Sequence, residues 1–102
     1  MNEWTHKEWT KIKNTNKVSA YYLYAPMCGT CQVASKMLEV VQELVPDMPM
    51  GKANLNYVQE IAALYEVESV PCLLITKNGK LKEKIYAFKS VPHLYDRLKS
   101  VD

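Results

Sequence analysis

The stretch VSAYYLYA, from Val18 to Ala25, constrains the fold most, because it is almost continuously apolar or aromatic. Runs of this kind are typical of strands that are buried on both faces of a parallel sheet. A helical pattern follows, in which apolar residues recur at intervals of three and four until Pro46 ends it. Its inward positions are Cys31, Ala34, Leu38, Val41 and Val45. We therefore predict a central strand followed by a helix that packs on the sheet.

Capping signals on both sides of this unit predict further helices. Thr5 and Glu8 have the spacing of a capping box, so a helix is expected to begin near Thr5. Trp4 and Trp9 occupy the positions of a hydrophobic staple around that helix start. Near the other end of the chain, Ser90 is expected to cap a last helix.

The segments between these helices predict three more strands. MPMGKANLN supplies a short strand, and Asn56 is expected to cap the helix that follows it. Asn78 and Gly79 favour a type I′ hairpin, because both central residues of that turn need a positive φ. The hairpin strands lie within VPCLLITKNGKLKEKIYAF, so the sheet ends antiparallel. We predict one domain over residues 1–102, an α/β fold with a mixed four-stranded sheet flanked by helices.

Composition narrows the classes of function. The chain of 102 residues has a net charge of +2 with both signs interspersed, which gives no indication of nucleic-acid or anionic-membrane binding. No run approaches the ~18 apolar residues of a membrane span, and the first residues contain no apolar stretch of signal-peptide length. We therefore expect a cytoplasmic protein with no nucleic-acid or membrane partner. In that reducing compartment, three cysteines with one close pair favour redox or metal chemistry over structural disulfides.

Cys28 and Cys31 stand three residues apart, where the strand gives way to the helix. Cys31 continues the buried stripe, whereas Cys28 lies at the helix tip, where backbone N–H groups have no intrahelical partner. These donors and the helix dipole favour a thiolate at Cys28. Gly29 leaves the helix tip open to a substrate disulfide. We therefore predict that Cys28 attacks the substrate and that Cys31 resolves the mixed disulfide.

Two motifs carry a resemblance to a known family. MCGTC stands where thioredoxins have Cys-Gly-Pro-Cys, and VESVPCLLITKNGKL is similar to their segment of a cis proline, a strand and an Asn-Gly hairpin. The chain thus resembles thioredoxins, in particular small bacterial-type ones, over nearly its whole length. The resemblance implies a thioredoxin-like fold that lacks the usual first strand. It also implies that Val70-Pro71 is a cis bond beside Cys28, with the Val70 backbone offering an edge to an extended substrate.

The surface around the cysteine pair departs from the family pattern. Met27 stands where a tryptophan usually precedes the first cysteine, and Thr30 replaces the proline between the two cysteines. Ala87, or Tyr86 if the register shifts, stands in place of a glycine of the substrate groove. These changes predict an altered redox potential and a narrower range of substrates.

The residues expected to handle protons also differ from the family. Tyr22 aligns with the buried aspartate that serves the second cysteine, so the usual proton acceptor is absent. Lys52 matches the family's buried lysine but is expected to be a rim cation, because its carboxylate partner is missing. The neighbouring tyrosines Tyr21 and Tyr24, like Tyr22, are interpreted as strand core rather than as a binding box.

The third cysteine, Cys72, directly follows the proline of the second motif. We expect it to be a packed small hydrophobe, the usual role of a buried free cysteine. The alternatives are a second disulfide or a third metal ligand beside Cys28 and Cys31. His6 and His93 have no close cysteine spacing and are expected at the surface rather than in a metal site.

The leading prediction is a monomeric thiol–disulfide oxidoreductase that needs no cofactor and no metal. It would exchange disulfides with protein or low-molecular-weight substrates and would be recharged by a thiol or flavin-dependent reductase. One alternative is a thioredoxin-fold binding or regulatory module without turnover, which the loss of the buried acid at Tyr22 supports. The other is a metal or iron–sulfur carrier that uses Cys28, Cys31 and Cys72.

Overall fold

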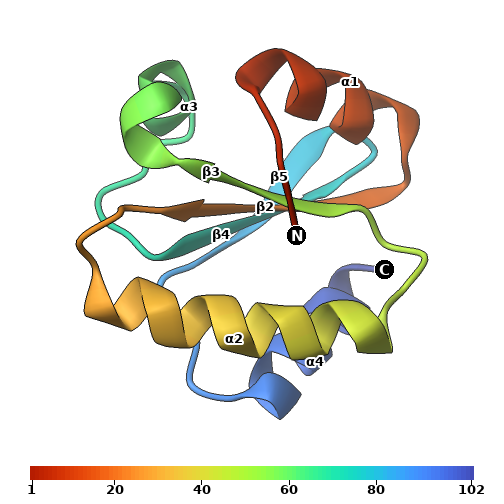
Figure 1. The fold of residues 1–102 in the computed structure, drawn as a ribbon. Coiled ribbons are helices and arrows are strands. Elements are labelled where there is room, and N and C mark those ends of the chain that lie inside the picture. The colour runs from red at the N-terminus through yellow and green to blue at the C-terminus, as the bar shows by residue number, and fades with distance from the viewer.

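A five-stranded sheet forms the framework of the protein in a computed structural model that describes residues 1–102. The strands are β1 (Asn2–Glu3), β2 (Val18–Tyr24), β3 (Met50–Asn54), β4 (Cys72–Lys77) and β5 (Lys80–Ile85), in the order β1-β3-β2-β4-β5 across the sheet. The helices are α1 (His6–Thr15), α2 (Gly29–Leu44), α3 (Gln59–Leu64) and α4 (Val91–Val101), with a 3₁₀ turn η1 (Leu55–Tyr57) before α3. Helices α1 and α3 cover one face of the sheet, and α2 and α4 cover the other (Figure 1). None of them combines the length and the apolar character needed to cross a membrane.

Strand β2 lies at the centre of the sheet, as predicted. It pairs in parallel with β3 on one side and antiparallel with β4 on the other. The predicted hairpin joins β4 to the antiparallel strand β5, and Asn78 and Gly79 at its turn have φ values of 53° and 82°. The α/β class and the mixed character of the sheet are therefore confirmed.

The prediction of four strands, without a first strand, is wrong. Asn2 and Glu3 form β1, which pairs in parallel with Gly51 and Lys52 of β3. Two residues are too few to show the alternation of apolar and polar side chains by which a strand is recognised in a sequence. Strand β1 forms because it pairs with the edge of β3, so only the tertiary structure reveals it.

Side chains of β2 alternate between two hydrophobic cores, because successive residues of a strand point to opposite faces of the sheet. Ala20 and Tyr22 belong to the core under α2 and α4, whereas Tyr21 and Leu23 belong to the core under α1 and α3. The predicted stripe of α2 packs into the first core through Ala34, Leu38, Val41 and Val45. The fold thus anchors β2 from both sides.

The capping box at the start of α1 is confirmed. The backbone N–H of Glu8 donates to Thr5 Oγ1 at 3.1 Å, and the backbone N–H of Thr5 donates to Glu8 Oε1 at 3.1 Å. Trp4 and Trp9 both stack on the ring of Tyr21, with centroids 6.0 and 4.6 Å away. The two indoles therefore tie the start of α1 to the central strand.

Of the other two predicted helix caps, one is confirmed and one is wrong. Ser90 caps α4, since its Oγ accepts the backbone N–H of His93 at 3.2 Å. Asn56 does not cap α3; its own backbone N–H donates to the Asn54 side chain at 2.9 Å, so Asn54 caps η1. Helix α3 begins later, after Val58, without a side-chain cap. Two asparagines two residues apart are both good cap formers, and the sequence alone does not choose between them.

Gly51 allows the Trp4 indole to approach the backbone of β3, because a Cβ at this position would overlap the indole. We expect Gly51→Ala to lower the free energy of unfolding by about 1–3 kcal/mol, the usual cost of overpacking. Urea unfolding followed by tryptophan fluorescence measures this loss. Gly29→Ala is the matched control, since no atom lies within 4 Å of its added methyl group. An equal loss in both variants would contradict the packing argument.

Candidate active site

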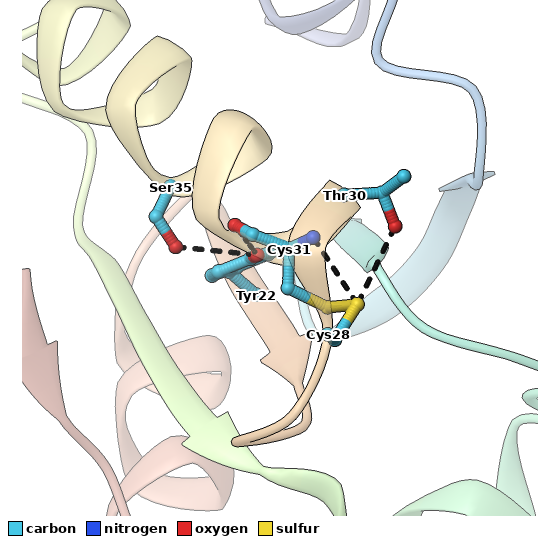
Figure 2. Close-up of a disulfide and its surroundings, with 5 residues drawn as sticks. All are labelled: Tyr22, Cys28, Thr30, Cys31 and Ser35. Atoms are coloured by element: carbon cyan, nitrogen blue, oxygen red, sulfur yellow. Dashed lines mark hydrogen bonds between the residues drawn. A yellow bond between two sulfur atoms is a disulfide. The ribbon is translucent and has the colours of Figure 1, made fainter.

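Cys28 and Cys31 lie at the N-terminus of α2, just after the loop that leaves β2 (Figure 2). Cys28 is the N-cap residue and has an extended backbone, with φ −121° and ψ 105°. Cys31 lies in the first turn of the helix. The two cysteines form a disulfide, with their Cα atoms 5.2 Å apart. The spacing of three residues at a helix start therefore brings the pair within bonding reach, as predicted.

The two sulfur atoms differ in their surroundings. The backbone N–H of Cys31 donates to Cys28 Sγ at 3.1 Å, and Thr30 Oγ1 lies 3.4 Å from the same sulfur (Figure 2). Both groups can stabilise negative charge on Cys28 Sγ, as can the positive end of the helix dipole. Cys28 is partly exposed, whereas Cys31 is only 3% exposed. The arrangement can therefore supply one accessible thiolate and one sheltered thiol.

The surface beside Cys28 is open. Met27 is 99% exposed, and no atom lies within 4 Å of a Cβ built on Gly29. Thr30 is also exposed. A flexible, unbranched thioether thus stands where the family has a rigid indole, and such a side chain adapts to differently shaped partners.

Tyr22 lies against the first turn of α2, beneath the cysteine pair (Figure 2). Its hydroxyl donates to the backbone carbonyl of Cys31 at 2.7 Å and accepts a hydrogen bond from Ser35 Oγ at 3.2 Å. Burial raises the pKa of Tyr22, and the hydrogen bond from Ser35 opposes part of that rise. Sequence reasoning missed Ser35. Its only sequence signal is a spacing of four residues from Cys31, which places both on one face of the helix.

Lys52 is opposite Tyr22 in the register of β2 and β3, but its ammonium lies elsewhere. Its Nζ atom is 5.6 Å from the centroid of the Tyr24 ring, in a cation–π contact at a partly exposed position. The Tyr24 hydroxyl donates to Glu3 Oε1 at 2.5 Å. Burial and the neighbouring Glu3 raise the pKa of Tyr24 to about 12. Lys52 thus occupies a rim position on the Tyr24 ring.

The bond between Val70 and Pro71 is cis, as the resemblance implied. Pairing of Leu23 with Cys72 places this bond at the same end of the sheet as the loop that leads from β2 to Cys28. Val70 and Pro71 are both partly exposed. The cis bond therefore lies at a partly exposed position at the end of the sheet where β2 leads to Cys28.

Side chains of β5 and of the loop after it hold the segment that precedes this cis bond. Lys84 Nζ donates to the carbonyls of Tyr65 and Glu66 at 3.0 and 2.9 Å. The Tyr86 hydroxyl accepts a hydrogen bond from the backbone N–H of Glu68 at 3.1 Å, so the Tyr86 side chain is bound to the segment before the cis bond. Ala87, the residue aligned with the groove glycine, is the exposed one of the two.

Cys72 is a free cysteine, 0% exposed, in the core under α1 and α3. Burial raises its pKa to about 12, although the charge of Lys84 and a hydrogen bond with Tyr86 act in the opposite direction. Helix α2, which carries the other two cysteines, covers the opposite face of the sheet (Figure 1). Cys72 therefore belongs to a different core from the one into which α2 packs. No group of three or more His, Cys, Asp or Glu side chains is arranged to hold a metal.

The two histidines also lie apart from the cysteines. The Nδ1 atom of His6 lies 3.6 Å from Glu60 Oε1, between α1 and α3, and His93 lies in the first turn of α4. Both side chains are partly exposed.

A dithiol at the start of the helix after a central strand, with a cis proline at the same end of the sheet, defines a thioredoxin-fold redox protein. The sequence model of the Thioredoxin family matches residues 1–100, and the chain belongs to this family. Thioredoxin-like protein YusE of Bacillus subtilis (strain 168) is 54% identical over 78 residues, which are 76% of this chain and 74% of that protein. Thioredoxin of Mycoplasmoides gallisepticum is 29% identical over 92 residues, which are 90% of this chain and 92% of that protein.

Solved structures confirm the fold. A mutant thioredoxin from Halobacterium salinarum NRC-1 has a TM-score of 0.88 at 25% identity, over 99% of this chain and 88% of that chain. The oxidised mitochondrial thioredoxin 3 from Saccharomyces cerevisiae has a TM-score of 0.87 at 24% identity, over 98% of this chain and 94% of that chain. The family and its Cys28–Cys31 dithiol support thiol–disulfide oxidoreductase function for this protein.

The reduced Cys28 thiol is expected to have a pKa below the ~8.5 of a free cysteine. The Cys31 N–H, the Thr30 hydroxyl and the helix dipole all favour its thiolate. The rate of Cys28 alkylation by iodoacetamide is measured against pH in the Cys31→Ser variant, which keeps the backbone N–H. Thr30→Val, which removes the hydroxyl and keeps the shape, should move the midpoint back toward the ordinary value. A midpoint at or above ~8.5 in Cys31→Ser itself would refute the proposed activation.

Cys72 is expected to resist alkylation at pH 8 in the folded protein, because burial keeps its thiol protonated and shielded. With a pKa near 12, only about one molecule in ten thousand carries the thiolate at that pH. The measurement uses a variant with Cys28→Ser and Cys31→Ser, labelled with and without guanidinium chloride and analysed by mass spectrometry. Labelling of the folded variant at the rate of a free thiol would show that Cys72 is accessible and would contradict its description as a packed core residue.

Proposed function

We propose that the protein exchanges disulfides with Cys28 as the attacking cysteine and Cys31 as the resolving cysteine. One observation carries the assignment: the partly exposed Cys28 sulfur accepts the Cys31 backbone N–H at 3.1 Å, while Cys31 itself is 3% exposed. In the reduced protein the same N–H can hold the Cys28 thiolate, which then attacks without rearranging its surroundings. A buried thiol reacts only with a partner that Cys28 has first brought to it.

The reaction follows from these two positions. In the reduced protein, the Cys28 thiolate attacks one sulfur of a substrate disulfide, the substrate S–S bond breaks, and the other sulfur leaves as a thiolate that takes a proton from water. Cys31 then loses its proton to water and attacks Cys28 Sγ, so the Cys28–Cys31 S–S bond forms, the mixed disulfide breaks, and the second substrate sulfur leaves as a thiolate that takes a proton from water. Two electrons pass from the dithiol to the substrate. The protein ends with the Cys28–Cys31 disulfide.

Family membership implies protein disulfides as substrates and a reductase that recharges the pair. We assign an extended substrate segment to the backbone of Val70 beside Pro71, and its apolar contact to Met27. Low-molecular-weight disulfides also fit an open site whose Gly29 has no neighbouring atom in the way. A thiol or flavin-dependent reductase as electron donor, a monomeric state and a cytoplasmic location complete the proposal.

The uncharged Tyr22 favours a second candidate, a module that binds partners without turning over. A phenol that donates to a carbonyl supplies no proton acceptor for Cys31. If water does not accept the Cys31 proton in place of the family's aspartate, Cys31 attacks slowly. The protein then remains oxidised or covalently bound to its partner. Such a protein would recognise the same partners but would not release them as products.

The Cys31→Ser variant distinguishes the two candidates. Cys28 should then form mixed disulfides that persist, because the thiol that displaces the partner is absent. The variant is incubated with cell extract under non-reducing conditions, and the captured proteins are released with dithiothreitol and identified by mass spectrometry. Cys28→Ser and the variant with both serines are the controls, since a partner held by Cys72 would survive in both.

Capture of discrete proteins through Cys28, together with release of the same proteins as thiols by the reduced parent, supports the oxidoreductase. Capture through Cys28 without release of the same proteins as thiols by the reduced parent would replace it with the binding module, and so would capture at the level of the controls while the parent still binds partners without a covalent link.

A further inference from the structure

We propose that Tyr22 is a positioning residue for disulfide exchange. Its hydroxyl holds the backbone carbonyl of Cys31 and thereby restrains the turn whose Cys31 N–H is directed at the Cys28 sulfur. The inference rests on the proposed function of the cysteine pair and adds a residue from a different element, β2. Tyr22 acts through hydrogen bonds to the backbone, and not as a substitute for the acid that the family pattern has at this place.

The Tyr22 ring is fixed before its hydroxyl reaches the helix. The side chain is 0% exposed, stacks on Tyr24 with centroids 5.9 Å apart and meets Phe88 edge to face at 5.8 Å. The hydroxyl therefore has a defined position, and it lies 2.7 Å from the carbonyl oxygen of Cys31 (Figure 2). This is a short bond from a rigid donor to the turn that carries the active site.

Ser35 sets the direction of the hydrogen bonds around Tyr22. Its Oγ donates to the Tyr22 hydroxyl at 3.2 Å, and a hydroxyl that accepts a hydrogen bond becomes a stronger donor. The phenol proton is thus directed to the Cys31 carbonyl. Because burial also raises the pKa of Tyr22, the residue keeps this proton and does not take one from Cys31.

The carbonyl carbon of the group that Tyr22 holds is one bond from the Gln32 nitrogen and two bonds from the Cys31 nitrogen, and both N–H groups contact Cys28. It shares a peptide group with the N–H of Gln32, which donates to the Cys28 carbonyl at 3.3 Å. The preceding peptide group supplies the Cys31 N–H, which donates to Cys28 Sγ at 3.1 Å. Restraining the carbonyl fixes the peptide plane after Cys31, and the Gln32 N–H of that plane is hydrogen-bonded to Cys28, so the turn that carries the Cys31 N–H is restrained as well. Hydrogen bonds weaken steeply as their alignment is lost, so a freer turn stabilises the Cys28 thiolate less.

Strand β2 offers a matched control in the preceding residue. Tyr21 is also 0% exposed, and its hydroxyl donates to the backbone carbonyl of Trp4 at 2.6 Å, on the opposite face of the sheet. Tyr22→Phe and Tyr21→Phe each remove one hydroxyl-to-carbonyl hydrogen bond and keep the ring. Both variants should therefore lose similar thermal stability, while only Tyr22→Phe should change the chemistry of the cysteine pair.

Two readouts report that chemistry, namely the pH midpoint of Cys28 alkylation and the equilibrium of the dithiol with glutathione. We expect Tyr22→Phe to raise the midpoint by about half a pH unit, which lowers the thiolate fraction about threefold below the midpoint. At a pH above the midpoint, where the reduced form is mostly thiolate, the equilibrium should move about threefold toward the disulfide, equivalent to a reduction potential about 14 mV more negative. Tyr21→Phe should leave both values unchanged. Equal shifts in the two variants, or no shift in Tyr22→Phe, would overturn the proposal.

Ser35→Ala provides a second test that leaves the core intact. It keeps the phenol and removes only the bond that strengthens it, so both readouts should shift in the same direction by less than in Tyr22→Phe. If Tyr22→Phe fails to fold, the absence of any shift in Ser35→Ala overturns the proposal. Both readouts are properties of the cysteine pair and need no protein substrate. Failure of the capture experiment would therefore remove the proposed function while these measurements still decide the role of Tyr22.

Discussion

Strand β2 has no exposed face along most of its length, so each of its side chains must find a place in one of two cores. Burial of a large apolar side chain contributes about 1.5–3 kcal/mol, and a slip of one residue would exchange the faces of all of them. Tyr21, Tyr22 and Leu23 are each 0% exposed. The end of β2 is thereby fixed, and the loop that leaves it places Cys28 at the start of α2.

Hydroxyl groups, rather than a buried charge, lie beneath the resolving cysteine. A buried carboxylate without a partner costs several kcal/mol, whereas the phenol of Tyr22 has its hydrogen bonds satisfied by Ser35 and by the Cys31 carbonyl. Lys52 then has no buried acid to pair with, and its ammonium lies against the Tyr24 ring. The residue type at position 22 thus accounts both for the missing proton acceptor and for the position of the Lys52 ammonium on the Tyr24 ring.

The sheet also separates Cys72 from Cys28 and Cys31, although the family resemblance places all three at the same end of the sheet. Cys72 follows the cis proline, at the end of the sheet where Cys28 lies, yet its side chain belongs to the core under α1 and α3. Alternation along β4 gives it that direction, because Leu73 next to it faces the core under α2 and α4. A third thiol can therefore persist beside a redox pair without joining its chemistry.

Local patterns in the sequence were enough to predict the central strand, the helix that carries Cys31, the first helix cap and the Asn78-Gly79 turn, because each depends on neighbouring residues alone. They also indicated which cysteine is exposed, since this follows from the helix register. Strand β1, the cap by Asn54 and the hydrogen bond from Tyr22 to the active-site turn came only from the tertiary structure. A two-residue strand has no periodicity, and a side chain on a strand contacts a helix carbonyl only once the sheet has brought the two elements together.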